Sequence, residues 1–306
     1  MNKLTICIPV YERIDYFESA IESALNQTVK CDMLVSDNAS SHTKFRDFCE
    51  LNNIPYFRNE NNLGVFGNWN KCIELAKTPF ALILSDDDVL KPTYVEDFLN
   101  TLREHPQLDM YYTNFDIYDF GSKEFLSHHH CIPFGYFENN LEVLKYGVEH
   151  GLSFPIFTTA IKKSKFDGFQ EKFHSCSDWI WMYSEIRKLN LFGNENLLVT
   201  RGNHDNNDSK NSDTSVRALV GMSYIYGIRL NEIFNKNYRL KLKSIVKANS
   251  LIINLFAYNE NDKIQRILDN RFNIYGAMIQ KKYFLKFVPK AILKLIYQLF
   301  FRRYFG

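Results

Sequence analysis

Phe80–Asp88, with the sequence Phe-Ala-Leu-Ile-Leu-Ser-Asp-Asp-Asp, carries the clearest structural signal in the chain. Its apolar run predicts a strand buried on both faces, and three carboxylates follow it directly. In open α/β sheets, ligands bind at the carboxyl ends of the strands, which is where these carboxylates would lie. Adjacent carboxylates repel one another, and either a solvated turn or a divalent cation makes the repulsion tolerable. The cluster alone therefore fits a metal site or an acidic turn that precedes a helix at Pro92.

Strand-like and helix-like segments alternate through the first hundred residues. Short β-rich runs occur at 4–10, 33–35, 54–57 and 80–84. Segments with apolar residues at helical spacing occur at 16–25, 44–51, 69–76 and 94–103. This alternation predicts an α/β fold with a mainly parallel central sheet flanked by helices. Beyond residue 108 the pattern weakens, and 120–140 and 202–215 are predicted to be loops.

The composition is that of a globular protein. Of its 306 residues, 45% are hydrophobic and 24% are charged, which excludes disordered and fibrous classes. The six cysteines have no C-x-x-C spacing, so we expect reduced thiols rather than a disulfide framework or a zinc site. No secretory signal and no apolar run of membrane-spanning length are evident, and a cytoplasmic location is expected.

Basic residues dominate the C-terminal segment, which is predicted to be helical from Val216 onward. No Asp or Glu follows Asp269, whereas eight Lys and Arg residues do. Four lysines spaced four apart share one face of a predicted helix, beside an apolar stripe: Lys282, Lys286, Lys290 and Lys294. This pattern predicts an amphipathic helix on a membrane surface, or alternatively one that packs on the preceding domain. No base-reading motif accompanies the charge, so nucleic acid is not expected as a partner.

Polar turns also follow the first two predicted strands. Tyr11 and Glu12 follow the first and Asp37 follows the second, so both turns are expected at the same sheet edge as the acidic run. An aromatic ring can stack on a base, and a carboxylate can accept a hydrogen bond from a ring N–H or a ribose hydroxyl. The combination fits a nucleotide, although Asp37 could equally be an N-cap. Neither G-x-G-x-x-G nor a P-loop motif is present.

Four motifs follow one another along this part of the chain: I-P-V-Y-E at the first strand end, S-D-N-A-S at the second, N-x-G followed by N-W-N, and S-D-D-D-x-x-x-P. In this order they resemble the family-2 inverting glycosyltransferases of the GT-A fold. The resemblance is strongest over the first hundred residues. It implies a GT-A catalytic domain over 1–215, with a nucleotide-sugar-binding half at 1–105 and an acceptor-binding half at 106–215. A helical C-terminal region would occupy 216–306.

The resemblance also implies roles for individual residues. The nucleobase and ribose of a nucleotide-sugar would be held by Pro9, Tyr11, Glu12 and Asp37, with Asn62 and Gly64 lining the same pocket. The D-x-D function, in which carboxylates hold Mn²⁺ or Mg²⁺ against the donor diphosphate, would come from Asp86, Asp87 and Asp88.

The D-x-D motif can be placed on residues 85–88 in two ways. Counted directly, D-x-D gives Asp86 and Asp88. Counted back from Pro92, Ser85 takes the leading position, and Asp87 and Asp88 are retained. Asp88 is common to both, so the sequence favours Asp88 as a metal ligand, while Asp86 and Asp87 compete for the second role.

The family places its general base, an Asp, at the start of a helix about 90 residues after the metal motif. Asp178 matches this position, with Ser177 where Glu is usual, and would take the proton of the acceptor hydroxyl. The alternative is that Asp178 only caps the helix. The segment Thr200–Asp205 resembles the family's R-x-H segment with one extra residue, so His204 is either near the diphosphate and metal or exposed in a polar loop.

These residues predict a metal-dependent inverting glycosyltransferase. The expected donor is a UDP-sugar, and the expected acceptor is a hydroxyl of a lipid-linked or polysaccharide glycan. The enzyme would be peripheral on the inner face of the cytoplasmic membrane. Two other hypotheses fit part of the pattern: a non-catalytic nucleotide-sugar-binding scaffold of a membrane glycan-assembly complex, and a nucleotidyltransferase that uses the acidic triplet for two-metal chemistry.

Overall fold

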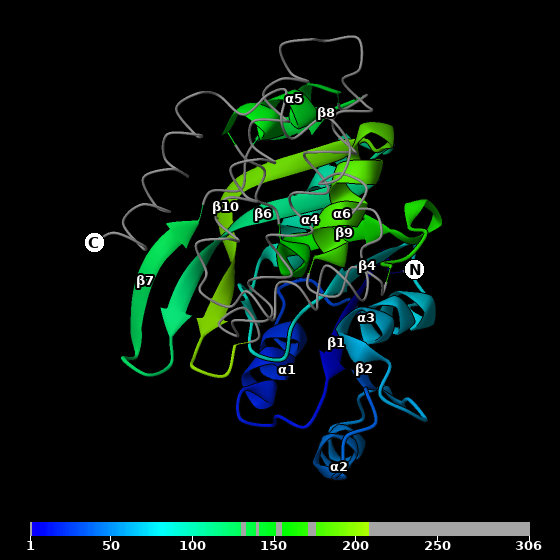
Figure 1. The fold of residues 1–306 in the computed structure, drawn as a ribbon, viewed down its shortest axis with the longest axis vertical. Coiled ribbons are helices and arrows are strands. Elements are labelled where there is room, and N and C mark those ends of the chain that lie inside the picture. Colours follow the sequence, from blue (N-terminus) through cyan, green and yellow to red (C-terminus); the bar gives the residue numbers. More distant parts are fainter. Residues whose placement is uncertain (1, 130–132, 139–140, 151–154, 171–175, 208–306) are drawn as a thin grey trace, which may run out of the picture. The chain divides into compact units, whose positions relative to one another are not determined.

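A computed structural model of the chain describes residues 2–129, 133–138, 141–150, 155–170 and 176–207 (Figure 1). The predicted domain boundary at 215 and the predicted basic C-terminal helix lie outside these residues. None of the helices within the described ranges is both long and apolar enough to span a bilayer. Membrane association through the C-terminal segment therefore stays a prediction from the sequence.

The N-terminal part alternates strands and helices, as the sequence pattern predicts. Its elements are β1 (Leu4–Val10), α1 (Phe17–Leu25), β2 (Asp32–Asp37), α2 (Lys44–Leu51), β3 (Tyr56–Arg58), α3 (Gly64–Leu75), β4 (Phe80–Ile83), β5 (Val89–Leu90) and α4 (Tyr94–Glu104). The second part consists of β6 (Met110–Asp119), β7 (Glu124–His129), β8 (Gly135–Phe137), α5 (Leu141–His150), β9 (Thr159–Lys162), α6 (Ser177–Glu185) and β10 (Leu191–Asn203).

One sheet joins all the described strands, in the order β3-β2-β1-β4-β9-β6-β10-β5, with β7 paired to β6 and β8 paired to β10. The four strands β3, β2, β1 and β4 run parallel to one another. Parallel neighbours need crossover connections, and the helices α1, α2 and α3 supply them. Figure 1 shows the sheet with α3 and α6 packed against it. The predicted α/β class with a central sheet flanked by helices is confirmed.

The prediction of a mainly parallel sheet came from the first hundred residues and is confirmed for those four strands, whereas the second part has mixed strand directions. There, β9 runs antiparallel to both β4 and β6, and β10 runs antiparallel to β5 and β8, whereas the β6–β10 pair is parallel. The reason is that strand direction depends on connections that the residue pattern does not encode. A strand of four residues such as β9 carries no signal of its own direction.

The prediction that 120–140 forms a loop is also wrong. β7 pairs antiparallel with the end of β6, after a turn in which Lys123 has a positive φ of 60°. In β7, the consecutive residues Phe125 and Leu126 are both exposed. The alternation of buried and exposed residues that marks a strand in a sequence is therefore missing from β7.

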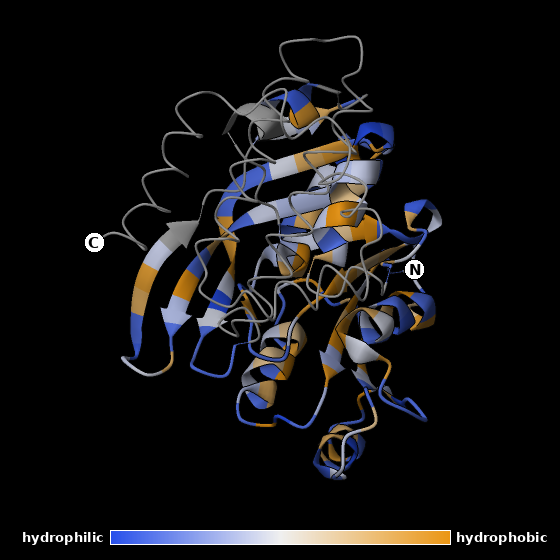
Figure 2. Ribbon diagram, in the orientation of Figure 1, coloured by the Kyte–Doolittle hydropathy of each residue, from blue (hydrophilic) through white to orange (hydrophobic). Residues whose placement is uncertain are grey.

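The core lies along the central strands. Every residue of β1 and of β4 is buried, and each fully buried Leu or Ile stabilises the fold by about 2 kcal/mol. α3 covers one face, where the Cys7 thiol donates to the carbonyl oxygen of Cys72 at 3.5 Å. Both cysteines are free and buried, as expected for structural thiols. Figure 2 shows hydrophobic residues along the central strands and hydrophilic residues at the loops that end them.

Candidate active site

The carboxyl ends of β1 and β2 lie side by side. Parallel pairing places Val10 beside Asp37, and the N–H of Asn38 donates to the carbonyl oxygen of Val10 at 2.9 Å. β4 lies on the other side of β1, where the N–H of Leu84 donates to the carbonyl oxygen of Cys7 at 2.9 Å. The polar turns that follow these three strands therefore meet at one sheet edge, as the sequence predicts.

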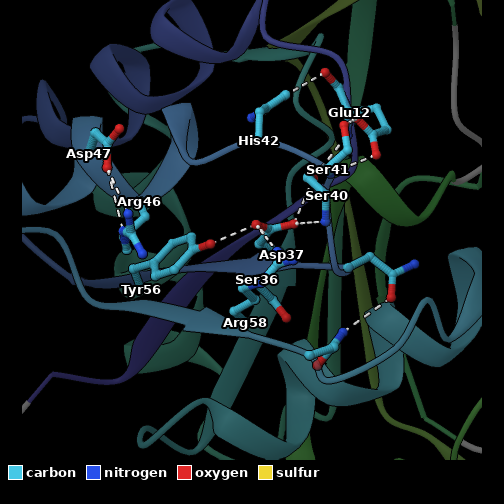
Figure 3. Close-up of polar contacts among 12 residues, drawn as sticks. Glu12, Ser36, Asp37, Ser40, Ser41, His42, Arg46, Asp47, Tyr56 and Arg58 are labelled. Atoms are coloured by element: carbon cyan, nitrogen blue, oxygen red, sulfur yellow. Dashed lines mark hydrogen bonds and ion pairs between the residues drawn. The ribbon is translucent and has the colours of Figure 1, made fainter.

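Asp37 is a fully buried carboxylate surrounded by donors (Figure 3). One oxygen accepts from the backbone N–H and the hydroxyl of Ser40, at 2.9 and 2.7 Å. The other accepts from the Tyr56 hydroxyl at 2.6 Å and from Arg58 at 3.3 Å. Asp37 is not an N-cap, because α2 begins after Thr43. The side chain of Arg58 is 45% exposed, so this donor is accessible from solvent although Asp37 itself is buried.

Glu12 joins two loops of the site. It has a positive φ of 57°, and its carboxylate accepts from the backbone N–H and the hydroxyl of Ser41, both at 2.8 Å (Figure 3). These hydrogen bonds lower the pKa of Glu12. Of the other predicted residues of this turn, Pro9 is buried within β1, whereas the Tyr11 ring is 47% exposed. Tyr11 is thus the residue of the turn that offers an aromatic surface to a ligand.

Asn62 and Gly64 form the turn that starts α3. Asn62 Oδ1 accepts from the Gly64 N–H and from the side-chain amide of Asn38, both at 2.8 Å. Gly64 has a φ of +74°, which favours glycine. α3 consequently begins five residues before the predicted start at Trp69. Asn38, which directly follows Asp37, thus links this turn to the end of β2.

A buried amide network beneath these turns was not predicted from the sequence. Asn68 Oδ1 accepts from the Ser36 hydroxyl at 2.8 Å and from the Asn59 side chain at 3.0 Å. Asn68 also donates to the carbonyl oxygen of Ser36 at 3.0 Å. The signal was the first Asn of N-W-N, which falls on the apolar face of a helix and therefore needs a buried polar partner.

Arg13 and His204 lie directly against the acidic turn. Arg13 forms an ion pair with Asp86 and a second one, at 3.0 Å, with Asp87 Oδ2. His204 Nε2 lies 2.9 Å from the same oxygen of Asp87 and 3.0 Å from Arg13 Nη1. His204 is buried rather than exposed in a loop. The structure thus brings Asp86, Asp87 and His204 together, and it adds Arg13, which the sequence analysis left without a role.

The His204 ring is held by neighbours that the sequence analysis also missed. It stacks on Tyr16, with ring centroids 4.6 Å apart, and Tyr16 stacks in turn on Phe120 at 4.1 Å. Asn207 accepts from the His204 N–H at 2.6 Å and donates to Asp87 Oδ2 at 3.1 Å. These contacts fix Nε2 of the ring toward the acidic turn, while Nδ1 is buried and has no hydrogen-bond partner among the described residues.

Asp88 is held away from this cluster. Its Oδ1 accepts from the backbone N–H of Gly202 in β10 at 3.0 Å, and only 3% of the residue is exposed. Burial, and then the neighbouring Asp87, raise the pKa of Asp88. The sequence favours Asp88 as a metal ligand, but in the structure this carboxylate ties the acidic turn to β10, whereas Asp87 lies beside His204.

The ion pair with Arg13 does not fully compensate the negative charge of Asp86. Burial raises the pKa of Asp86 to about 6, Arg13 opposes the rise, and Asp87 adds to it. A carboxyl with this pKa titrates close to neutral pH. One guanidinium therefore does not compensate the acidic turn fully, and additional positive charge would stabilise its ionised form.

Asp178 is buried near the start of α6, in the second part of the chain. Burial raises the pKa of Asp178 to about 7, and the backbone N–H groups of Trp179 and of Asp178 itself oppose the rise. Among the described residues, no side chain donates a hydrogen bond to this carboxylate. It is not an N-cap, because Cys176 occupies that position. A carboxylate with such a pKa is suited to take a proton at neutral pH.

Two residues of the acidic site fit a divalent cation. No group of three or more His, Cys, Asp or Glu side chains in the described ranges is arranged to hold a metal ion. Asp87 Oδ2 and His204 Nε2 nevertheless converge, and Mg²⁺ in proteins commonly uses one or two carboxylates, with phosphate oxygens and waters completing its shell. The arrangement suits a cation that binds together with a phosphate-bearing ligand.

The model of the family described as "Glycosyl transferase family 2" matches residues 5–165. The chain belongs to this family. The matched region includes β1 to β4, the acidic turn and β9, and hence the sheet edge at which the polar turns meet. Asp178, His204 and Asn207 lie beyond it.

Similar proteins carry related descriptions. An uncharacterized glycosyltransferase of Rickettsia felis is 26% identical over 214 residues, which are 68% of this chain and 35% of that protein. The chain thus spans about a third of that relative. A protein of Campylobacter jejuni named GalNAc(5)-diNAcBac-PP-undecaprenol beta-1,3-glucosyltransferase is 35% identical over 96 residues, 29% of this chain and 31% of its own length.

A solved structure shares the fold. The crystal structure of S. aureus TarS 1-349 in complex with UDP-GlcNAc matches with a TM-score of 0.61 and 14% identity, and the match covers 87% of this chain and 79% of that one. At this identity the likeness shows the fold alone. It agrees with the GT-A expectation for the described residues.

Proposed function

We propose that this chain is a metal-dependent inverting glycosyltransferase that moves a sugar from a UDP-sugar to a hydroxyl of a lipid-linked or polysaccharide glycan. The observation that carries the proposal is Asp178, a buried carboxylate without a side-chain partner among the described residues and with a pKa raised to about 7. A structural aspartate would be expected to have donors around it, as Asp37 has. Family membership supplies the reaction class in which such a base is needed.

The donor would bind at the edge formed by the ends of β1, β2 and β4. Tyr11 offers an exposed ring for the base, and Asp37 offers a carboxylate whose partner Arg58 is accessible. A uracil ring N–H or a ribose hydroxyl would replace Arg58 as a donor to Asp37. A UDP-sugar is proposed because the TarS structure that shares the fold was solved with UDP-GlcNAc.

Asp178 would act on the acceptor. In an inverting transfer, the acceptor oxygen attacks the anomeric carbon on the face opposite the diphosphate. The bond from this carbon to the diphosphate oxygen breaks, and its electron pair leaves with the nucleoside diphosphate. The hydroxyl proton moves to the carboxylate of Asp178, which must be ionised beforehand. Trp179, which follows Asp178 and is partly exposed, offers a ring on which an acceptor sugar can pack.

Asp87 and His204 would hold Mn²⁺ or Mg²⁺. When bound, the cation supplies positive charge that stabilises the leaving diphosphate. The convergence of two ligand atoms and the incomplete charge compensation of Asp86 support this assignment. We propose Asp87 rather than Asp88, because Asp87 Oδ2 lies 2.9 Å from His204 Nε2.

The acceptor is the least constrained part of the proposal. Its support is the Campylobacter jejuni relative, whose name states an undecaprenol-linked glycan, and the basic segment that follows Asp269. A lipid-linked glycan at a membrane surface would combine both observations.

A nucleoside-diphosphate release assay over a panel of UDP-, GDP- and dTDP-sugars tests the proposal. We expect release of UDP from one donor, stimulation by undecaprenyl-diphosphate-linked glycans, and loss of the release in EDTA. Donor binding without turnover, with every donor and acceptor, would favour the scaffold hypothesis. Pyrophosphate release from a nucleoside triphosphate would instead indicate a nucleotidyltransferase.

A further inference from the structure

We propose that Arg13 is a resident cation of the acidic turn that competes with the divalent metal and is withdrawn by the donor diphosphate, so that it couples metal binding to donor binding. The inference rests on the proposed function, because it assumes a metal at Asp87 and His204. It adds a positioning residue outside the D-x-D segment.

The position of Arg13 follows from a tight turn after β1. The N–H of Arg13 donates to the carbonyl oxygen of Tyr11 at 2.6 Å, across Glu12 with its positive φ. This turn leaves the Glu12 side chain on Ser41 and the Arg13 side chain on the acidic residues. Glu12 and Arg13 are adjacent in the chain, but their side chains are therefore held by different loops of the site.

The guanidinium contacts both atoms that would ligate the metal. Its Nη2 lies 3.0 Å from Asp87 Oδ2, and its Nη1 lies 3.0 Å from His204 Nε2. A cation bound to Asp87 and His204 would lie next to these nitrogens. The guanidinium carries a positive charge at any ordinary pH, and at an effective dielectric constant of about 20 two like charges about 4 Å apart repel strongly. Arg13 and the metal therefore cannot both occupy this place.

Arg13 also has unused hydrogen-bonding capacity and is accessible to a ligand. Its Nε is buried without a hydrogen-bond partner among the described residues, and its side chain is still 23% exposed. In the proposed assignment Asp87 and His204 hold the metal, which leaves Asp86 to pair with Arg13. A diphosphate at this edge would offer oxygens that accept two parallel hydrogen bonds from a guanidinium. Moving onto the diphosphate, Arg13 would keep Asp86 as its anchor and release Asp87 and His204.

The test is the Mn²⁺ affinity of the full chain, measured by the electron paramagnetic resonance signal of free Mn²⁺, without nucleotide and with saturating UDP. We expect Arg13→Gln to bind Mn²⁺ at least about tenfold more tightly than the wild type without UDP, a change of about 1.4 kcal/mol. The additional tightening by UDP should shrink by a similar factor, because the residue proposed to couple the two ligands is missing. The same loss should appear as a smaller effect of Mn²⁺ on UDP affinity, since coupling between two ligands is reciprocal. A merely structural role of Arg13 would have the opposite effect, because loss of its ion pairs would loosen the site.

Two further variants keep the result interpretable. Arg46→Gln removes the same charge from an exposed position on α2 and should leave Mn²⁺ affinity unchanged. Arg13→Lys keeps the charge without the two-pronged geometry and should fall between the wild type and Arg13→Gln. Circular dichroism checks that each variant is folded.

The outcomes separate this inference from the proposed function. Weaker or unchanged Mn²⁺ binding in Arg13→Gln overturns the inference and leaves the transferase proposal intact. Absence of Mn²⁺ binding to the wild type, with and without UDP, overturns the inference together with metal dependence. An Arg13-dependent Mn²⁺ affinity in a chain that releases no nucleoside diphosphate would support the inference and contradict the proposed function.

Discussion

Asp37 at the end of β2 and Asp178 near the start of α6 are both buried aspartates, but their surroundings are opposite. Asp37 accepts hydrogen bonds from Ser40, Tyr56 and Arg58. Asp178 accepts from backbone groups at the start of its helix, and burial raises its pKa to about 7. The first environment stabilises the charged form and fixes the side chain. The second leaves the carboxylate poised to exchange a proton.

Burial alone therefore does not assign a role to an aspartate. The number of donors around a buried carboxylate decides whether its charged form is stabilised, as at Asp37, or its pKa is raised, as at Asp178. Four predictions test this contrast between Asp37 and Asp178.

The largest expected effect is that of Asp178→Asn on turnover. The amide keeps the shape but cannot take a proton, so we expect kcat to fall by about 10²- to 10⁴-fold while UDP binding is unchanged. UDP release and calorimetric titration with UDP measure the two quantities. Glu185→Gln at the other end of α6, where Glu185 pairs with Lys188 on the surface, is the control and should retain activity. Turnover of Asp178→Asn within a few-fold of wild type would exclude Asp178 as the base.

The second effect concerns the free energy of unfolding, which substitution by Asn should lower at Asp37 but not at Asp178. Asp37→Asn leaves buried donors facing an amide and should lower the free energy of unfolding by about 2 kcal/mol. Asp178→Asn should leave it unchanged or raise it, because a neutral amide costs less to bury than a carboxylate. Urea denaturation at pH 8, where Asp178 is ionised, measures both. Equal destabilisation by the two substitutions would contradict the contrast.

The third effect is the pH dependence that follows from the raised pKa of Asp178. With metal saturating, kcat should rise about tenfold per pH unit below pH 7 and level off above it, since the base must be ionised. The same raised pKa contributes stability that is fully present below 3.8, the ordinary pKa of an aspartate, and is lost as the pH rises through about 7. A pH–rate profile between 5.5 and 8.5 tests the first statement, and a flat profile would argue against Asp178.

The smallest effects are expected among the partners of Asp37. Tyr56→Phe removes a hydrogen bond to a buried carboxylate and should cost about 1.5 kcal/mol of unfolding free energy. Arg58→Gln removes an exposed partner and should cost less than about 1 kcal/mol. Urea midpoints rank the two, and a larger loss for Arg58→Gln would show that the exposed ion pair matters more to Asp37 than its buried hydrogen bond.

Much of the N-terminal part could be predicted because local signals agree with the fold there. The buried strand before the acidic run, the helical spacing of the next segments and the turn residues all indicate βαβ units. The edge where Asp37 and the acidic turn meet follows from the topology of parallel strands.

The remainder depended on long-range contacts that a residue pattern does not contain. The acidic turn consists of three aspartates in a row, which the sequence alone cannot tell apart. Their roles differ only through contacts with Gly202, Arg13 and His204, which are distant in the chain. The consecutive exposed residues Phe125 and Leu126 gave no strand pattern for β7. The direction of β9 depends on its connections.

Gly64 and Gly202 are both glycines that the site requires, for unlike reasons. Gly64 has a φ of +74° and open space around it, so backbone conformation sets the limit and Asn would be the least harmful replacement. Gly202 does not have a positive φ. A Cβ at this position would, however, overlap the carbonyl oxygen of Asp87 and the ring of Phe120. Mutational tolerance at position 202 is therefore limited by volume, and even alanine would push the acidic turn away from β10.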